Sequence, residues 1–171
     1  MATVIFIKES RQNPSAMRAV INYCQQEYKT FDSRSKRQLV SGINCDGANS
    51  FREFMATKKV YGKTDGIFFY QYAQSFSPTE KLTPEQAHEI SMEFAERAWP
   101  GQEILVATHC DANHLHSHFV INSVSFESGK KTPPVALYSQ TVKSAQRRDL
   151  PRSRALRSHA IRERRPQDFQ P

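Results

Sequence analysis

Four of the six histidines in this 171-residue sequence fall within residues 109–118. Side chains alternate between the two faces of a β-strand. His109 and Asp111 therefore share a face if the first part of this segment is a strand. His116 and His118 share a face of the next strand by the same rule. A loop of about four residues would make the two strands antiparallel neighbours, so that three imidazoles converge on one point.

Three imidazoles with free coordination positions are what a catalytic metal ion requires, because the substrate must reach the ion. We expect a divalent metal at His109, His116 and His118, with Mn²⁺ or Mg²⁺ first and Zn²⁺, Co²⁺ or Ni²⁺ as alternatives. Asp111 would orient an imidazole or accept a proton. His114 is out of phase and belongs to the loop. A single histidine is more often a surface or core residue, and only the number and spacing favour a metal.

The surrounding pattern predicts an α+β domain, with helices packed on one side of a largely antiparallel five-stranded sheet. The clearest helix start is a capping box at Thr83 and Gln86, with Pro84 in the first turn. We expect strands at 3–8, 39–44, 66–76, 103–111 and 115–126, and helices at 13–26, 50–59 and 84–99.

The net charge of +7 is unevenly distributed. Residues 132–171 hold nine Lys and Arg against three Asp and Glu, whereas residues 1–131 hold fifteen against fourteen. We therefore expect a folded core at 1–131 and a basic, Pro/Arg-rich tail at 132–171. The three cysteines do not indicate a disulfide scaffold. No apolar run reaches the ~20 residues of a membrane span, and no signal peptide is evident, so a cytoplasmic location is expected.

The histidine segment also resembles a known motif. The pattern His-x-Asp-x₄-His-x-His-x₃-Asn is formed here by His109, Asp111, His116, His118 and Asn122. It resembles the third motif of mobilisation-protein relaxases, a family of the HUH endonuclease superfamily. This resemblance implies an HUH endonuclease-like fold and a metal-binding role for the three histidines.

Two other segments fit the same family in the same order. Residues 19–23, followed by Lys29 and Thr30, resemble its first motif, in which the tyrosine is the nucleophile. Residues 74–76 and 83–88 resemble the strand and helix that precede the metal motif. The resemblance implies that Tyr23 is the nucleophile, with Tyr28 as the rival candidate. Ser15, Lys29, Thr30 and Asn122 are then expected to contact DNA or support the site.

The implied activity is metal-dependent, site- and strand-specific DNA nicking at an origin of transfer, through a 5′-phosphotyrosyl intermediate. Such a reaction initiates conjugative mobilisation. The implied partners are single-stranded DNA at that origin and the accessory proteins of a relaxosome. The same parts could serve a rolling-circle replication initiator or a single-strand transposase. A non-enzymatic alternative is an inactive, truncated DNA-binding remnant.

The tail at 132–171 does not follow the family, whose members continue with an amphipathic helix. One interpretation is a disordered basic tail that binds the phosphate backbone. Another is that this segment is out of frame. Codons for residues 131–140 can be chosen so that a one-nucleotide shift encodes Lys-Leu-Arg-Gln-Ser-Pro-Tyr-Thr-Leu-Lys, which is similar to the family's continuation. In that case the nuclease core would lack its last helices.

Overall fold

The computed structural model describes residues 2–131, so the expectations for the tail at 132–171 lie outside the described residues. The strands are β1 (Thr3–Ile7), β2 (Phe31–Asp32), β3 (Arg37–Gln38), β4 (Val40–Ile43), β5 (Phe69–Ser75), β6 (Ile104–His109) and β7 (His116–Asn122). The helices are α1 (Pro14–Cys24), α2 (Glu27–Thr30), α3 (Ser50–Val60) and α4 (Pro84–Ala98), with a 3₁₀ turn at Gly47–Asn49.

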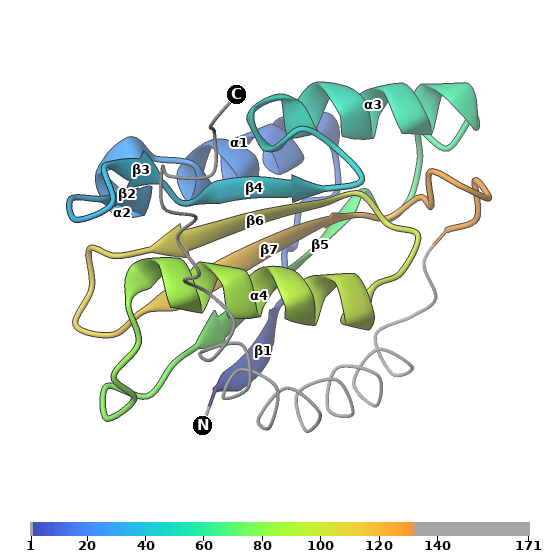
Figure 1. Cartoon of the computed structure of the whole chain (residues 1–171). Helices are drawn as coiled ribbons and strands as arrows, with labels where there is room; N and C mark the ends of the chain where they lie inside the picture. Colours follow the sequence, from blue (N-terminus) through green and yellow to red (C-terminus); the bar gives the residue numbers. More distant parts are fainter. Residues whose placement is uncertain (1, 132–171) are drawn as a thin grey trace, which may run out of the picture.

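Five strands form one sheet in the order β1-β5-β7-β6-β4 (Figure 1). Each neighbouring pair in this sheet is antiparallel. The predicted α+β class and the five-stranded antiparallel sheet are confirmed. β6 and β7 follow each other in the chain and lie side by side inside the sheet, as the histidine segment requires.

The helices divide between the two faces of the sheet, whereas the sequence pattern predicted them on one side. α4 packs against the face that carries Val106 and Phe119. α1 and α3 pack against the face that carries Leu105 and Val120, and Figure 1 shows them behind the sheet with α4 in front. All six residues of β6 are buried. A strand that is apolar on both faces needs cover on both.

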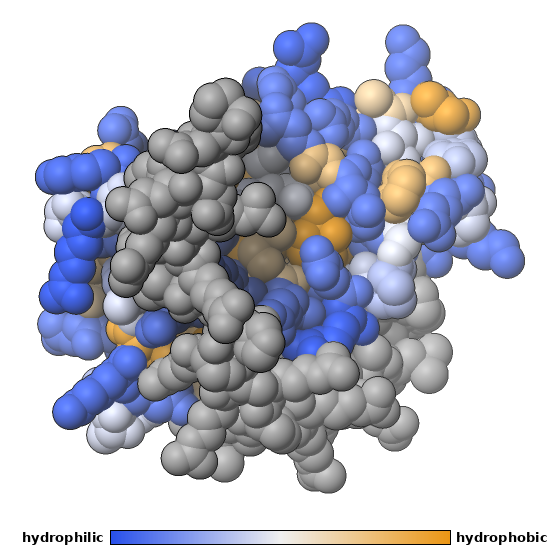
Figure 2. Space-filling model, in the orientation of Figure 1, coloured by the Kyte–Doolittle hydropathy of each residue, from blue (hydrophilic) through white to orange (hydrophobic). Residues whose placement is uncertain are grey.

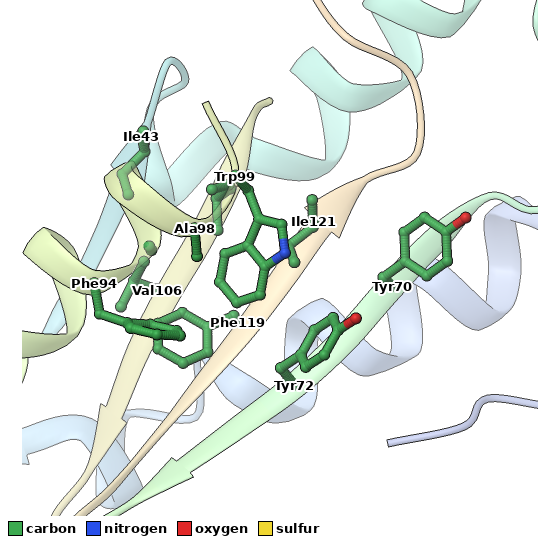
Figure 3. Close-up of a cluster of buried hydrophobic side chains, with 11 residues drawn as sticks. Ile43, Tyr70, Tyr72, Phe94, Ala98, Trp99, Val106, Phe119 and Ile121 are labelled. Atoms are coloured by element: carbon green, nitrogen blue, oxygen red, sulfur yellow. The ribbon is translucent and has the colours of Figure 1, made fainter. Parts of the chain in front are cut away.

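Aromatic side chains form the core beneath α4 (Figure 3). The Trp99 ring lies with its centroid 5.4 Å from that of Phe119 and 5.5 Å from that of Phe94. It also reaches Tyr72 on β5, at 5.0 Å. Rings at these separations pack favourably in tilted or edge-to-face arrangements. The end of α4 is thereby fixed over the three central strands.

The helix starts follow local sequence signals. Asn13 precedes α1, and its side-chain oxygen accepts a hydrogen bond from the Ala16 amide at 2.8 Å. The predicted capping box of α4 is confirmed. The Gln86 amide donates to the Thr83 hydroxyl at 3.2 Å, and the Gln86 side chain accepts from the Thr83 amide at 3.0 Å.

Element ends differ from prediction around the histidine segment. Residues 29–38, for which no helix or strand was predicted, contain the end of α2 and the short hairpin of β2 and β3. β6 ends at His109 instead of Asp111, because the Cys110 amide donates to the Lys29 carbonyl at 2.6 Å and leads the chain out of the sheet. Asp111 therefore lies in the loop between β6 and β7.

Hydrophilic side chains cover most of the described surface in the orientation of Figure 1, with only small apolar patches between them (Figure 2). Among the described residues, every helix is too short or too polar to cross a bilayer.

Candidate metal centre and tyrosine site

Three histidines converge where β6 ends and β7 begins. His109 and His116 are register partners in the antiparallel pair, and His118 follows on the same face of β7. One ring nitrogen from each of the three lies within 4.8 Å of the others. The ring centroids of His109 and His118 are 4.6 Å apart. The strand alternation read from the sequence therefore brings together the three residues expected to be ligands.

The chemistry of this cluster fits a bound cation. Burial lowers the pKa of His118 to about 3 and also lowers the pKa of His109, an effect that the Asp111 carboxylate opposes. These two imidazoles are therefore neutral near pH 7, the form that binds metals. Within residues 2–131, Nδ1 of His118 is buried without a hydrogen-bond partner. An unpaired buried nitrogen is costly unless something binds it.

The end of α1 orients one of the histidines. Nε2 of His109 lies 3.0 Å from the Cys24 carbonyl oxygen. A carbonyl can only accept, so this nitrogen carries the proton and Nδ1 keeps the free lone pair. Metal ligands are commonly oriented by such a hydrogen bond on the far side of the ring. The contact comes from the backbone, so no side-chain pattern in the sequence signals it.

Tyr23 lies beside the three imidazoles at the end of α1. Its ring centroid is 5.9 Å from that of His109 and 6.1 Å from that of His118. The side chain is 47% exposed, so a polymer could reach its hydroxyl. Tyr28, the rival candidate, is 70% exposed, and its hydroxyl donates to the Gln26 side chain at 3.2 Å. No ring contact joins Tyr28 to the histidines within the described part of the chain.

Lys29 covers the tyrosine. Its Nζ lies 3.9 Å from the centroid of the Tyr23 ring and 5.6 Å from that of Tyr28. A side-chain hydrogen bond with Tyr23 raises the pKa of Lys29, and the Asp111 carboxylate raises it further. Asp111 itself is exposed in the bend after β6. The site thus combines an accessible phenol, a cation, a carboxylate and three imidazoles.

Three other expected site residues lie elsewhere. Ser15 is exposed in the first turn of α1, eight residues and about 12 Å of helix before Tyr23. Thr30 is fully buried, and its hydroxyl bonds to the Gln26 carbonyl at 3.1 Å. Asn122 shares the histidine face, but it lies four residues beyond His118, about 13 Å along β7.

Asn122 belongs to a second polar cluster, which the sequence did not predict. Lys58 is fully buried, and its Nζ donates to the Asn122 side chain and to the Phe68 carbonyl. The Asn122 amide nitrogen donates to Glu103 at 2.6 Å. Both Lys58 and Lys59 fit the basic last turn of a helix, so no sequence signal predicted that Lys58 is buried.

The comparisons with known proteins agree with this geometry. Residues 23–149 match the relaxase family described as MobA/VirD2-like, nuclease domain. The match begins at Tyr23, includes all three histidines and continues past Lys131. The chain belongs to this MobA/VirD2-like relaxase nuclease-domain family, as the sequence motifs implied.

The chain is similar to parts of longer relatives. Over 117 residues it is 42% identical to protein rlx of Staphylococcus aureus. This alignment covers 68% of this chain and 34% of that relative. Over 148 aligned positions it is 31% identical to the group II intron-interrupted relaxase LtrB of Lactococcus lactis subsp. cremoris (strain MG1363), covering 70% of this chain and 26% of LtrB. The chain thus spans about a third or less of these relatives.

Proposed function

We propose that this chain is a metal-dependent relaxase that nicks one DNA strand at an origin of transfer and holds the cut end on Tyr23. The observation that carries the proposal is the accessible Tyr23 ring beside three converging imidazoles. The family relationship supports a relaxase role, and relatives named for a relaxase favour mobilisation over replication initiation or transposition.

The reaction is a transesterification. The Tyr23 oxygen attacks the scissile phosphorus, a new O–P bond forms, and the bond from phosphorus to the 3′ oxygen breaks. The phenolic proton is transferred to the Asp111 carboxylate, and the departing 3′ oxygen takes up a proton from water to become a hydroxyl. One phosphodiester replaces another, so the bond energy is kept for rejoining the strand.

His109, His116 and His118 would hold the cation, with Mn²⁺ or Mg²⁺ as the expected ions. When bound, the cation polarises the scissile phosphate and neutralises developing charge. Nζ of Lys29 lies over the Tyr23 ring and shares a side-chain hydrogen bond with Tyr23. Its positive charge stabilises the negative charge that the phenolic oxygen carries during attack. The expected partners are single-stranded DNA at the origin and relaxosome accessory proteins.

The proposal is tested by covalent capture. Purified protein is mixed with Mn²⁺ and a labelled single-stranded oligonucleotide that spans the nick site, and adducts are resolved on a denaturing gel. We expect an adduct with the wild-type protein and with Tyr28→Phe, and none with Tyr23→Phe. The two variants make the same change five residues apart, so an adduct that persists in Tyr23→Phe and disappears in Tyr28→Phe would reassign the nucleophile. Retarded mobility of the oligonucleotide on a native gel, without any adduct on the denaturing gel, would support the inactive, DNA-binding remnant.

A further inference from the structure

A buried chain of polar groups lies on the α4 face of the sheet, directly behind the histidine cluster. Thr108 and Ser117 are register partners on β6 and β7, and both are fully buried. Their hydroxyl oxygens are 2.8 Å apart. Thr108 precedes His109, and Ser117 stands between His116 and His118. The hydroxyl pair therefore joins the backs of the two strands that carry the imidazoles.

His88 of α4 connects this pair to the edge of the sheet. Its Nδ1 lies 2.9 Å from the Thr108 hydroxyl, and its Nε2 lies 2.8 Å from the Ser41 hydroxyl on β4. At the other end of this chain of polar groups, the Ser91 hydroxyl lies 2.7 Å from that of Ser117. Ser91 also reaches the Gln74 side chain on β5, at 3.1 Å. The polar chain therefore links four strands of the sheet to α4.

The imidazole of His88 suits a bridging position. A neutral imidazole donates from one nitrogen and accepts at the other, and a hydroxyl can do both. His88 is buried, and burial lowers its pKa to about 4, with the charge of Arg37 acting in the same direction. The ring is therefore neutral near pH 7. Both of its nitrogens have partners, in contrast to Nδ1 of His118 on the opposite face.

We propose that His88 is a positioning residue that holds β6 and β7 so that His109, His116 and His118 converge before a metal ion binds. The inference rests on the proposed metal site. Its physical basis is that fixing Thr108 and Ser117 on one face fixes the backbone from which the three ligands project on the other. Ligands that are already in place need not be ordered at the moment of binding.

Two substitutions at His88 each keep one of its hydrogen bonds and remove the other. Asn carries its amide group near the position of Nδ1, so His88→Asn keeps the bond to Thr108 and loses the bond to Ser41. Gln places its amide near the position of Nε2, so His88→Gln does the reverse. Only the Thr108 bond leads to the histidine strands. We therefore expect His88→Asn to preserve metal binding, and His88→Gln and His88→Ala to weaken it.

The experiment titrates Co²⁺ into the full chain and follows the visible absorption of the bound ion. We expect the wild-type protein to bind Co²⁺ with a defined spectrum. His88→Ala and His88→Gln should bind about tenfold more weakly, with an altered spectrum, and His88→Asn should be close to wild type. Thr108→Val, which removes the hydroxyl at nearly constant volume, should lose affinity as His88→Ala does. If His88→Ala does not fold, the Co²⁺ affinity of Thr108→Val tests the positioning role of His88 in its place.

Ser123→Ala is the control for general destabilisation. Ser123 is a buried hydroxyl just past the far end of β7, where it accepts from Lys58 at 3.0 Å, and its removal should leave Co²⁺ affinity unchanged. Equal Co²⁺ affinity in the wild type, His88→Ala and Thr108→Val overturns the inference. So does loss of affinity in His88→Asn or in Ser123→Ala. A wild-type protein that binds no Co²⁺ overturns the metal site itself, and this inference with it.

Discussion

Two polar clusters lie on the same face of β6 and β7, at opposite ends of the strand pair. The imidazole cluster consists of His109, His116 and His118, and the lysine cluster is centred on Lys58 and Asn122. Buried apolar side chains on this face separate them, namely Leu105, Ala107 and Val120. Both clusters place polar groups on a covered sheet face, which is costly unless those groups find partners.

The difference between the clusters lies in how completely their hydrogen bonds are made. Nζ of Lys58 lies within hydrogen-bond distance of three acceptors, at Phe68, Asn122 and Ser123. In the imidazole cluster, Nδ1 of His118 has no partner within residues 2–131, and an exposed phenol lies beside it. The saturated cluster holds the fold together. The unsaturated cluster has binding capacity left for a ligand.

Removing one imidazole should have the largest effect. We expect His116→Ala to lower the nicking rate by at least about a thousandfold, because the cation loses one of its three protein ligands. The rate is measured with a labelled origin oligonucleotide and Mn²⁺. Much of the DNA binding should remain.

His114→Ala is the matched control for this change, because His114 lies two residues away in the exposed loop. It should nick at nearly the wild-type rate. Equal cleavage by His116→Ala and wild type would remove the metal from the mechanism.

The lysine cluster should respond through stability. Lys58→Met leaves three buried or partly buried acceptors without their donor, so we expect the free energy of unfolding to fall by about 2–3 kcal/mol. Lys59→Met, at the exposed neighbouring position, should change it by less than about 0.5 kcal/mol. Urea denaturation measures both. A Lys58→Met protein that stays folded but cannot bind metal would show that the two clusters are not independent.

The same lysine should make stability depend on pH. Burial lowers the pKa of Lys58 from 10.5 to about 7. Between these values the unfolded chain binds more protons than the folded chain, so the free energy of unfolding rises with pH. From pH 7 to pH 9 we expect the free energy of unfolding of the wild type to rise by about 1 kcal/mol per pH unit relative to that of Lys58→Met. Parallel pH profiles for the two proteins would contradict this pKa shift.

The smallest effect is expected at Lys29. Lys29→Met should slow nicking about tenfold, because the positive charge beside the Tyr23 oxygen is lost. Mn²⁺ affinity should be unchanged, since the three imidazoles remain. Lys59→Met serves again as the control. A Lys29→Met variant that nicks normally but binds the oligonucleotide more weakly would make Lys29 a DNA contact only.

The sequence predicts the imidazole cluster well because strand alternation is a local rule. His109, His116 and His118 share a face whatever the exact ends of β6 and β7 are. The same rule puts Asn122 on their face, but the rule fixes the face and not the distance along the strand. Asp111 was misplaced for a different reason. The strand end at His109 depends on the Cys110–Lys29 hydrogen bond, a contact between distant parts of the chain.

The sequence of β6 contains a signal for helices on both faces of the sheet. In β6, both Leu105 and Val106 are apolar, so neither face of the strand was suited to solvent and helices on both sides were to be expected. The burial of Lys58 had no such signal. Its partner Asn122 is 64 residues away in the sequence and reaches Lys58 only in the folded protein.

The most direct measurement is the identity of the residue that carries DNA after the reaction. Wild-type protein is treated with Mn²⁺ and the origin oligonucleotide, digested with nuclease and protease, and the nucleotide-bearing peptide is sequenced by mass spectrometry. We predict a 5′-phosphoryl nucleotide on Tyr23. A nucleotide on Tyr28, or on any residue remote from the imidazole cluster, would contradict the account.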